Sequence, residues 1–279
     1  MKRIILALCG ALIASPVLAA SCDPSPGSVC QGDQASSMAD LLEAVIEAQI
    51  VILGERHDNP IHHEKQAEIV RILAPAGLAF EMIKRAEEDV ANDRRTAWEN
   101  ESWSNWDDYR QILEAAPNAR ITGGGVDRDV LLSSVKNGAA LAWGAEGARY
   151  RLLDQLPIDV TEAMIEEQRV AHCDALPKPM LPGMVEAQQL RDAAFADAVL
   201  RLVEDGHEPA VLITGNGHAR TDRGSPLYLG RAAPLVSVLS IGIIEAGEMT
   251  DVPYDYVIYT EVHDREDPCE AFLKSRQKN

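Results

Sequence analysis

Histidines and glutamates gather after two apolar runs of the 279-residue chain. Glu55 and His57 follow Ile50–Leu53, and His218 follows Pro209–Thr214; both histidines stand in a Gly-x-x-His pattern. Imidazole and carboxylate groups bind divalent metals, and a carboxylate can also act as a general base. One such histidine would usually be structural, but the repeated pattern predicts a shared site that a divalent metal could occupy.

Three of the seven histidines fall within residues 57–63, two of them at the start of an expected helix. Asn59 followed by Pro60 is typical of an N-cap and first helical turn, which places His62 and His63 in that turn. A helix N-terminus disfavours a protonated imidazole, so we expect a lowered pKa for both rings, leaving them able to ligate iron or another metal. The free N–H groups of the turn also suit a carboxylate or phosphate. The alternative is that both histidines cap the helix and face solvent.

The apolar runs are short and rich in β-branched residues, as buried strands are. We expect strands at residues 50–55, 78–83, 119–122, 209–214, 235–244 and 254–260, and helices at 38–48, 61–73, 85–101 and over most of 129–205. This alternation predicts an α/β fold with a largely parallel central sheet and helices on both faces. The carboxyl ends of parallel strands lie at one edge, so Glu55, Glu81 and His218 should converge there.

The remaining segments are predicted from their composition. Residues 21–36 should be an irregular lead-in, and Pro177–Pro182 a loop or lid before a helix from Gln188 to Val203. Residues 264–279 should form a polar tail unless Cys269 ties them down.

Two further clusters have a structural and a functional interpretation. Trp103, Trp106 and Tyr109 form either a packing cluster or an aromatic wall for a flat ligand. The triple glycine at residues 123–125 lets the backbone approach a neighbouring segment or a ligand closely.

Residues 1–20 have the features of a secretory signal. Lys2 and Arg3 precede a mostly apolar stretch that ends in small residues. We therefore expect residues 21–279 to form a single domain in the periplasm. The alternative is a lipoprotein anchored at Cys22.

The chain carries a formal charge of −18, or −20 without Lys2 and Arg3. Such an acidic chain is a poor partner for nucleic acid and for anionic lipid, because both attract basic surfaces.

Four cysteines follow the signal, an even number that suggests disulfides in an exported chain. Three pairings are possible. Cys22 with Cys30 is the most local, and Cys173 with Cys269 would then follow; the alternative is that the cysteines are unpaired. Their spacing matches no zinc motif.

Several stretches together resemble the ChaN-like haem-binding family, within the wider Tiki, TraB and erythromycin-esterase-like superfamily. They are LGERHDNPIHHEKQ (53–66), AFEMI (79–83), WSNWDDYR (103–110), QLRDAAFA (189–196) and TGNGHARTDRGSPLYL (214–229). The resemblance implies a periplasmic or lipid-anchored haem-binding protein used in iron acquisition, with an outer-membrane haem uptake system as a possible partner. It also implies stacked haems between two subunits of a homodimer, tyrosine on iron and histidine near the propionates.

The family's site residues are carried over by matching motif positions. Glu55, His57, His62 and His63 match the first motif, Glu81 the second, and His218, Arg220 and Tyr228 the last. The family pattern often has a tyrosine before its Gly-x-Pro, where this chain has Arg223. Tyr228 is therefore the candidate iron ligand, Arg220 a propionate partner, and the four histidines ligand-orienting or propionate-binding groups.

Two functions follow from these residues. The first is an exported haem-binding protein, in which aromatic walls and cationic groups at the rim would hold a flat dicarboxylate ligand. The second is a divalent-metal-dependent hydrolase, with His57, Glu81 and His218 as metal ligands and Glu55 as general base.

Overall fold

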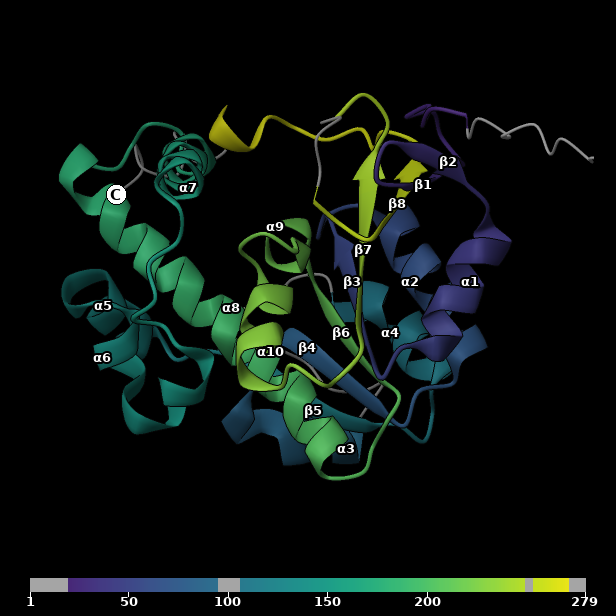
Figure 1. Ribbon diagram of the computed structural model, residues 1–279, viewed down its shortest axis with the longest axis horizontal. Coiled ribbons are helices and arrows are strands. Elements are labelled where there is room, and N and C mark those ends of the chain that lie inside the picture. Colours follow the sequence, from purple (N-terminus) through teal and green to yellow (C-terminus); the bar gives the residue numbers. More distant parts are fainter. Residues whose placement is uncertain (1–19, 95–105, 249–252, 271–279) are drawn as a thin grey trace, which may run out of the picture.

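The computed structural model describes residues 20–94, 106–248 and 253–270. Within them lies an eight-stranded sheet of order β2-β1-β8-β7-β3-β6-β4-β5 (Figure 1). Its strands are β1 (Val29–Gln31), β2 (Gln34–Ser36), β3 (Ile50–Glu55), β4 (Gly77–Lys84), β5 (Arg120–Gly125), β6 (Ala210–Gly215), β7 (Val238–Glu245) and β8 (Tyr256–Thr260). The strands from β8 to β5 are parallel, and β1 and β2 join antiparallel. The predicted α/β fold with a largely parallel sheet is confirmed.

Helices cover both faces of this sheet. They are α1 (Met38–Glu47), α2 (Pro60–Leu73), α3 (Glu88–Arg94), α4 (Trp106–Ala115), α5 (Arg128–Asn137), α6 (Ala139–Trp143), α7 (Ile158–Ala171), α8 (Leu181–Glu204), α9 (Asn216–Ala219) and α10 (Ser225–Ala232), with 3-10 turns η1 (Arg85–Glu87), η3 (Gly144–Tyr150) and η4 (Lys178–Met180). None of the described helices has the length and apolarity needed to cross a bilayer.

The two faces of β3 show how the core is divided. Val51 and Leu53 pack in one apolar cluster with α1, α2 and α4, whereas Ile50 and Ile52 pack in another with α8 and α10. Alternate residues of a strand point to opposite faces, so a continuous apolar run is required where both faces are covered. This requirement explains why the apolar run Ile50–Leu53 predicted the strand from the sequence.

The N-terminal segment differs from its prediction. Residues 22–28 belong to no helix or strand, as expected, but residues 29–36 are not irregular, because β1 and β2 form a hairpin that pairs with β8, with Cys30 opposite Val257. Each strand has three residues, too few for a recognisable alternation, and the pairing depends on an edge supplied by a distant part of the chain.

The segment Pro177–Pro182 also differs from the predicted loop or lid. It forms η4 and the first turn of α8, which begins at Leu181 rather than at Gln188. Pro182 lies in that first turn, where the missing N–H would have no helical partner in any case.

Both predicted disulfides are present. Cys22 is bonded to Cys30, and Cys173 to Cys269. The second bond ties the segment after β8 to the end of α7, so residues up to Glu270 are not a loose tail. Residues 271–279, Trp103 and the signal up to residue 19 lie outside the described residues.

A bulge interrupts the pairing of β4 with β5. Phe80 pairs with Gly123 and Lys84 with Gly125, so residues 81–83 of β4 face a single residue of β5. The glycines make this approach possible, since a Cβ on Gly123 would lie 2.3 Å from the Ile83 carbonyl oxygen. Bulges often redirect a side chain beside a site, and this one begins at Glu81.

We predict that Gly123→Ala destabilises the protein by roughly 1–3 kcal/mol, because the methyl group must displace backbone. The matched control is Gly230→Ala in α10, where a Cβ meets nothing within 4 Å. That change should stabilise the helix by roughly 0.5–1 kcal/mol. Urea unfolding measures both, and equal effects of the two substitutions would contradict the close approach.

Candidate functional site

Strands β3 and β6 lie side by side, with Glu55 opposite Gly215 at their carboxyl ends. After β3 the chain continues into α2 on one face of the sheet, and after β6 into α9 and α10, which pack on the other. In open α/β sheets, ligands bind beside adjacent strands whose connections leave to opposite faces, and this part of the sheet edge is here called the crevice. The predicted convergence of the Gly-x-x-His segments is confirmed: a Cβ on Gly215 would lie 2.9 Å from His57 Nε2.

His57 lies between two buried carboxylates. Its Nδ1 is 2.7 Å from Glu55 Oε1, and its Nε2 is 3.4 Å from Glu81 Oε1. Burial disfavours the charged ring, but the charges and hydrogen bonds of Glu81 and Glu55 outweigh it and raise the pKa of His57 to about 10. This arrangement favours the charged form of His57, and 39% of its side chain is exposed.

Glu81, the first residue of the β4 bulge, faces four hydrogen-bond donors. Its Oε2 accepts hydrogen bonds from the Thr214 hydroxyl at 2.6 Å and the Gly215 N–H at 2.8 Å. Its Oε1 faces His57 and accepts from Arg191 Nη2 at 3.2 Å. Burial alone would raise the pKa of this carboxyl, but the charges of His57 and Arg191 help to hold it well below its usual value.

Glu55 is compensated from the opposite side, by α2 and α4. The Tyr109 hydroxyl donates to Glu55 Oε1 at 2.5 Å. His63 Nε2 lies 3.2 Å from Oε2 without hydrogen-bond alignment, so neither atom has a hydrogen-bond partner among the described residues. Burial would raise the pKa of Glu55, but the hydrogen bond from His57 and the nearby His63 lower it to about 2.

His62 and His63 lie in the first turn of α2 and point into the interior of the protein. The alternative that they face solvent is wrong, since both are completely buried. His62 Nδ1 accepts the Arg56 N–H at 2.8 Å, and its Nε2 lies 3.0 Å from Thr260 Oγ1. The predicted lowering of the His62 pKa is confirmed, to about 4, although the main cause is burial. His62 thus joins the loop after β3 to the end of β8.

His218 is held by α8. Its Nδ1 is 2.6 Å from Asp192 Oδ1 and 3.0 Å from Gln188 Nε2, and its ring meets Phe195 edge-on at 4.7 Å. Burial raises the pKa of Asp192 to about 6, although the charge and hydrogen bond of His218 oppose that rise. His218 is therefore oriented beside the crevice but remains buried.

The divalent-metal alternative finds no support in this geometry. In the part of the chain that the structure describes, no three His, Cys, Asp or Glu side chains are grouped so that they could hold a metal ion. Both His57 nitrogens face carboxylates, and His218 Nδ1 faces Asp192. The predicted ligands His57, Glu81 and His218 do not form a common coordination shell.

In the free protein, the residues predicted to bind a propionate or the iron are buried or paired with other side chains. Arg220 donates twice to Asp222, at 3.0 and 2.8 Å, and only 12% of its side chain is exposed. Arg223 is buried and paired with Glu167 of α7. Tyr228 is completely buried under Arg231, and burial raises the pKa of its phenol.

The tyrosines share this burial. Each of the six in the sequence has at most 8% of its surface exposed: Tyr109, Tyr150, Tyr228, Tyr254, Tyr256 and Tyr259. Every tyrosine ring of the described residues is therefore buried.

Three site residues were not predicted from sequence. Gln188, Arg191 and Asp192 all come from one face of α8 and contact the crevice groups. Their spacing of three and four residues is the available signal, because such positions share a helix face. Tyr109 was predicted only as a wall or packing residue, and its hydrogen bond to Glu55 gives it a different role.

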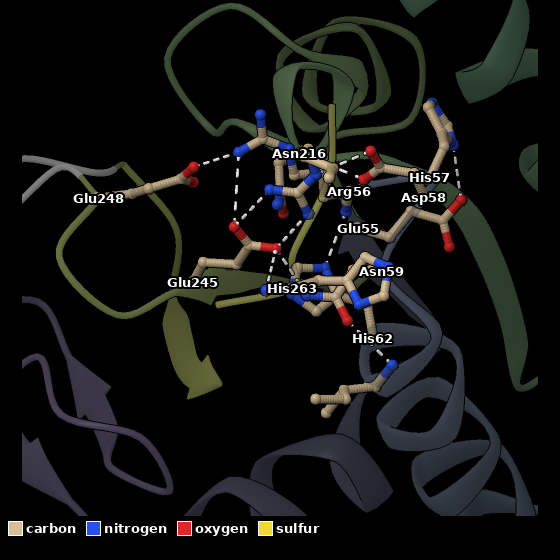
Figure 2. A network of polar contacts seen from close by, with 12 residues as sticks. Glu55, Arg56, His57, Asp58, Asn59, His62, Asn216, Glu245, Glu248 and His263 are labelled. Carbon is tan, nitrogen blue, oxygen red and sulfur yellow. Dashed lines mark hydrogen bonds and ion pairs between the residues drawn. The ribbon is translucent and has the colours of Figure 1, made fainter. Parts of the chain in front are cut away.

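A second polar network holds the loop that presents His57. Figure 2 shows Glu245 facing Arg56 and Asn59 of this loop. Glu245 is 2% exposed and accepts from Asn59 Nδ2 at 2.7 Å and from the His263 N–H at 3.3 Å. Its hydrogen bonds with Arg265 are the main reason that its pKa falls to about 2. Glu245 therefore joins the His57 loop, the end of β7 and the C-terminal segment.

Comparison with known proteins assigns the chain to a family. A family model described as haem-binding uptake, Tiki superfamily, ChaN matches residues 41–229. Among solved structures, the one described as cofacial haem binding to ChaN of Campylobacter jejuni is similar to this chain, with a TM-score of 0.65 and 19% sequence identity. The match covers 82% of this chain and 95% of that one. At this identity the likeness shows the fold.

Two other solved structures are less similar. The type III effector HopBA1 has a TM-score of 0.44 and 15% identity, covering 80% of this chain and 92% of that one. A succinoglycan biosynthesis protein has a TM-score of 0.44 and 14% identity, covering 74% and 68%. No curated protein matches the chain.

We predict a pH-dependent loss of stability from His62. Its folded-state pKa of about 4 lies below the ordinary 6.5, so the stability it contributes is complete above pH 6.5 and is lost as the pH falls toward 4. The loss should be on the order of 2–3 kcal/mol. His62→Gln, which cannot be protonated, should show a shallower decline of unfolding free energy in this window than the wild type. His207→Gln should keep the wild-type profile, and parallel profiles for all three proteins would contradict the assignment.

We predict that Tyr109→Phe lowers the free energy of unfolding by about 1.5–3 kcal/mol, because Glu55 loses a donor to its buried charge. The matched control is Tyr259→Phe, for whose hydroxyl no hydrogen bond is found among the described residues. Denaturant unfolding at neutral pH compares the two. A Tyr109→Phe protein as stable as this control would mean that the hydroxyl does not support Glu55.

Proposed function

The chain belongs to the ChaN family of haem-binding uptake proteins in the Tiki superfamily, and on this premise we propose that its crevice binds haem with His57 and Arg191 facing the propionates. The observation behind the proposal is a pair of half-exposed cations on one buried carboxylate. His57 and Arg191 both contact Glu81 Oε1, with 39% and 37% of their side chains exposed. Two cations at one rim suit a ligand that carries two carboxylates.

Arg191 retains donors for such a ligand. A guanidinium carries five N–H donors, and the contact with Glu81 at 3.2 Å uses one. The guanidinium carbon Cζ of Arg191 lies 5.5 Å from the centre of the Phe195 ring, a contact that helps to orient the guanidinium. Arginine also matches a carboxylate bidentately. These features favour Arg191 over Arg220, whose fork is already occupied by Asp222.

The fit to haem is partial. The rim residues have the charge that propionates require, whereas the buried tyrosines do not match tyrosine ligation of iron. Tyr228 as iron ligand stays a prediction, and it requires the ring to become exposed when haem binds. His62, His63 and His218 would then act by orienting neighbouring groups, since all three are buried.

We also propose export to the periplasm, a role in iron acquisition with an outer-membrane uptake system, and haem at a homodimer interface. Two disulfides favour an oxidising compartment. The bond between Cys22 and Cys30 counts against the lipoprotein alternative, because one sulfur cannot carry both a lipid thioether and a disulfide. Mass spectrometry of the mature N-terminus distinguishes the two forms.

We predict that Arg191→Gln weakens hemin binding about 10- to 100-fold, the cost of losing a charged hydrogen bond to a carboxylate. Absorbance titration of the mature protein measures the affinity. Hemin dimethyl ester, which has no free carboxylates, is the matched ligand, and Arg191→Gln should leave its affinity unchanged. Equal losses for both ligands would mean that Arg191 does not face the propionates.

Two further variants define the rest of the site. Arg149→Gln removes an exposed pair with Glu204 and should bind hemin as the wild type does. Tyr228→Phe should shift the Soret and charge-transfer bands if the phenolate binds iron. Unchanged bands would exclude Tyr228 as the ligand, and a wild-type protein that does not bind hemin would overturn the proposed function.

A further inference from the structure

The C-terminal segment of residues 261–270, here called the strap, runs along the carboxyl edge of the sheet. It leaves β8 and passes toward α7, as the yellow segment of Figure 1 shows. The contacts follow the strand order: His263 meets Glu245 at the end of β7, Arg265 reaches Asp58 after β3, and Cys269 is bonded to Cys173 after α7. The strap therefore connects the loop bearing His57 to the α7–α8 hairpin bearing Arg191.

Arg265 makes the central contacts of the strap. Its Nη1 donates to Glu245 Oε2 at 2.8 Å, its Nη2 donates to Glu245 Oε1, and its Nε donates to Asp58 Oδ2 at 2.8 Å. Glu245 also accepts a hydrogen bond from Asn59. Arg265 therefore holds Asp58 directly and Asn59 through Glu245. Only 17% of the Arg265 side chain is exposed.

The opposite end of the strap is covalent. Cys269 is bonded to Cys173, two residues beyond α7, and α7 packs on α8. Arg223, between α9 and α10, also pairs with Glu167 of α7. Movement of the strap would therefore be transmitted to both walls of the crevice.

We infer that Arg265 is a positioning residue for His57, acting through Asp58 and Glu245, and that the strap sets how firmly the crevice retains its ligand. The family match ends at residue 229, so the strap lies outside it. The effect on ligand retention rests on the proposed haem function. The effect on His57 does not, because it concerns the geometry of the free protein.

The test compares three strap variants of the mature protein with two controls. Arg265→Gln removes the central contact, Asp58→Asn removes its more exposed partner, and Cys173→Ser with Cys269→Ser releases the covalent end. The matched controls are Arg149→Gln and the double variant Cys22→Ser with Cys30→Ser, which remove an ion pair and a disulfide outside the strap.

Two measurements decide the outcome. Hemin transfer to excess apomyoglobin gives the dissociation rate, which strap variants should raise roughly 2- to 30-fold, the range over which residues outside a site alter ligand coupling. The His57 ring resonances, assigned with His57→Gln, should shift in Arg265→Gln and Asp58→Asn but not in the controls. Backbone amide exchange should also rise at residues 56–59 in these two variants.

The results separate this inference from the proposed function. If the wild type does not bind hemin, the proposed function fails, and the His57 resonances alone decide the role of Arg265. If the wild type binds hemin but Arg265→Gln matches Arg149→Gln in both dissociation rate and His57 resonances, the inference is overturned. The same holds if Asp58→Asn folds normally and leaves His57 unshifted.

Discussion

Two buried ionised carboxylates at one edge of the sheet determine the arrangement around them. Glu55 and Glu81 have almost no exposed surface, and an unpaired charge in such a position would cost several kcal/mol. The fold brings donors to them from separate elements: Tyr109 from α4, His57 from the loop after β3, Thr214 from β6 and Arg191 from α8. Removing one of these donors leaves charge uncompensated, so the elements are coupled through the site.

This compensation also gives the crevice its chemical character. The carboxylates face inward, and their shared partners His57 and Arg191 are the groups that reach solvent. A chain of formal charge −18 would repel a dicarboxylate over most of its surface, so a local cationic rim is needed to accept one. Both nitrogens of His57 face carboxylates. Among the residues that the structure describes, no three His, Cys, Asp or Glu side chains are grouped to hold a metal ion.

The second buried carboxylate network, at Glu245, performs a mechanical role. It joins β7, the His57 loop and the strap through hydrogen bonds of 2.7, 3.3 and 2.8 Å. Loops at a sheet edge have few apolar contacts, so polar contacts of this kind determine their position. His62 adds a third attachment, between the Arg56 N–H and Thr260. The loop that presents His57 is therefore fixed at several points although it belongs to no helix or strand.

The sequence alone determined the α/β class and the strand positions near Glu55 and Glu81, whereas it left the disulfide pairing open between alternatives that the structure resolved. The class and the strands could be predicted because strands buried on both faces require continuous apolar runs, and a helix start requires residues such as Asn59 and Pro60. Only the tertiary structure decided what each polar group contacts. Tyr228, Arg220 and His63 were assigned to a ligand from their motifs, which did not show that Tyr228 and His63 are buried or that Arg220 pairs with Asp222 in the free protein. The hydrogen bonds of Arg191, Tyr109 and Arg265 were not predicted, because a hydrogen bond to a carboxylate far along the chain leaves no local pattern. Periodicity records which face of an element is buried, whereas the partner of a buried charge depends on how the elements pack.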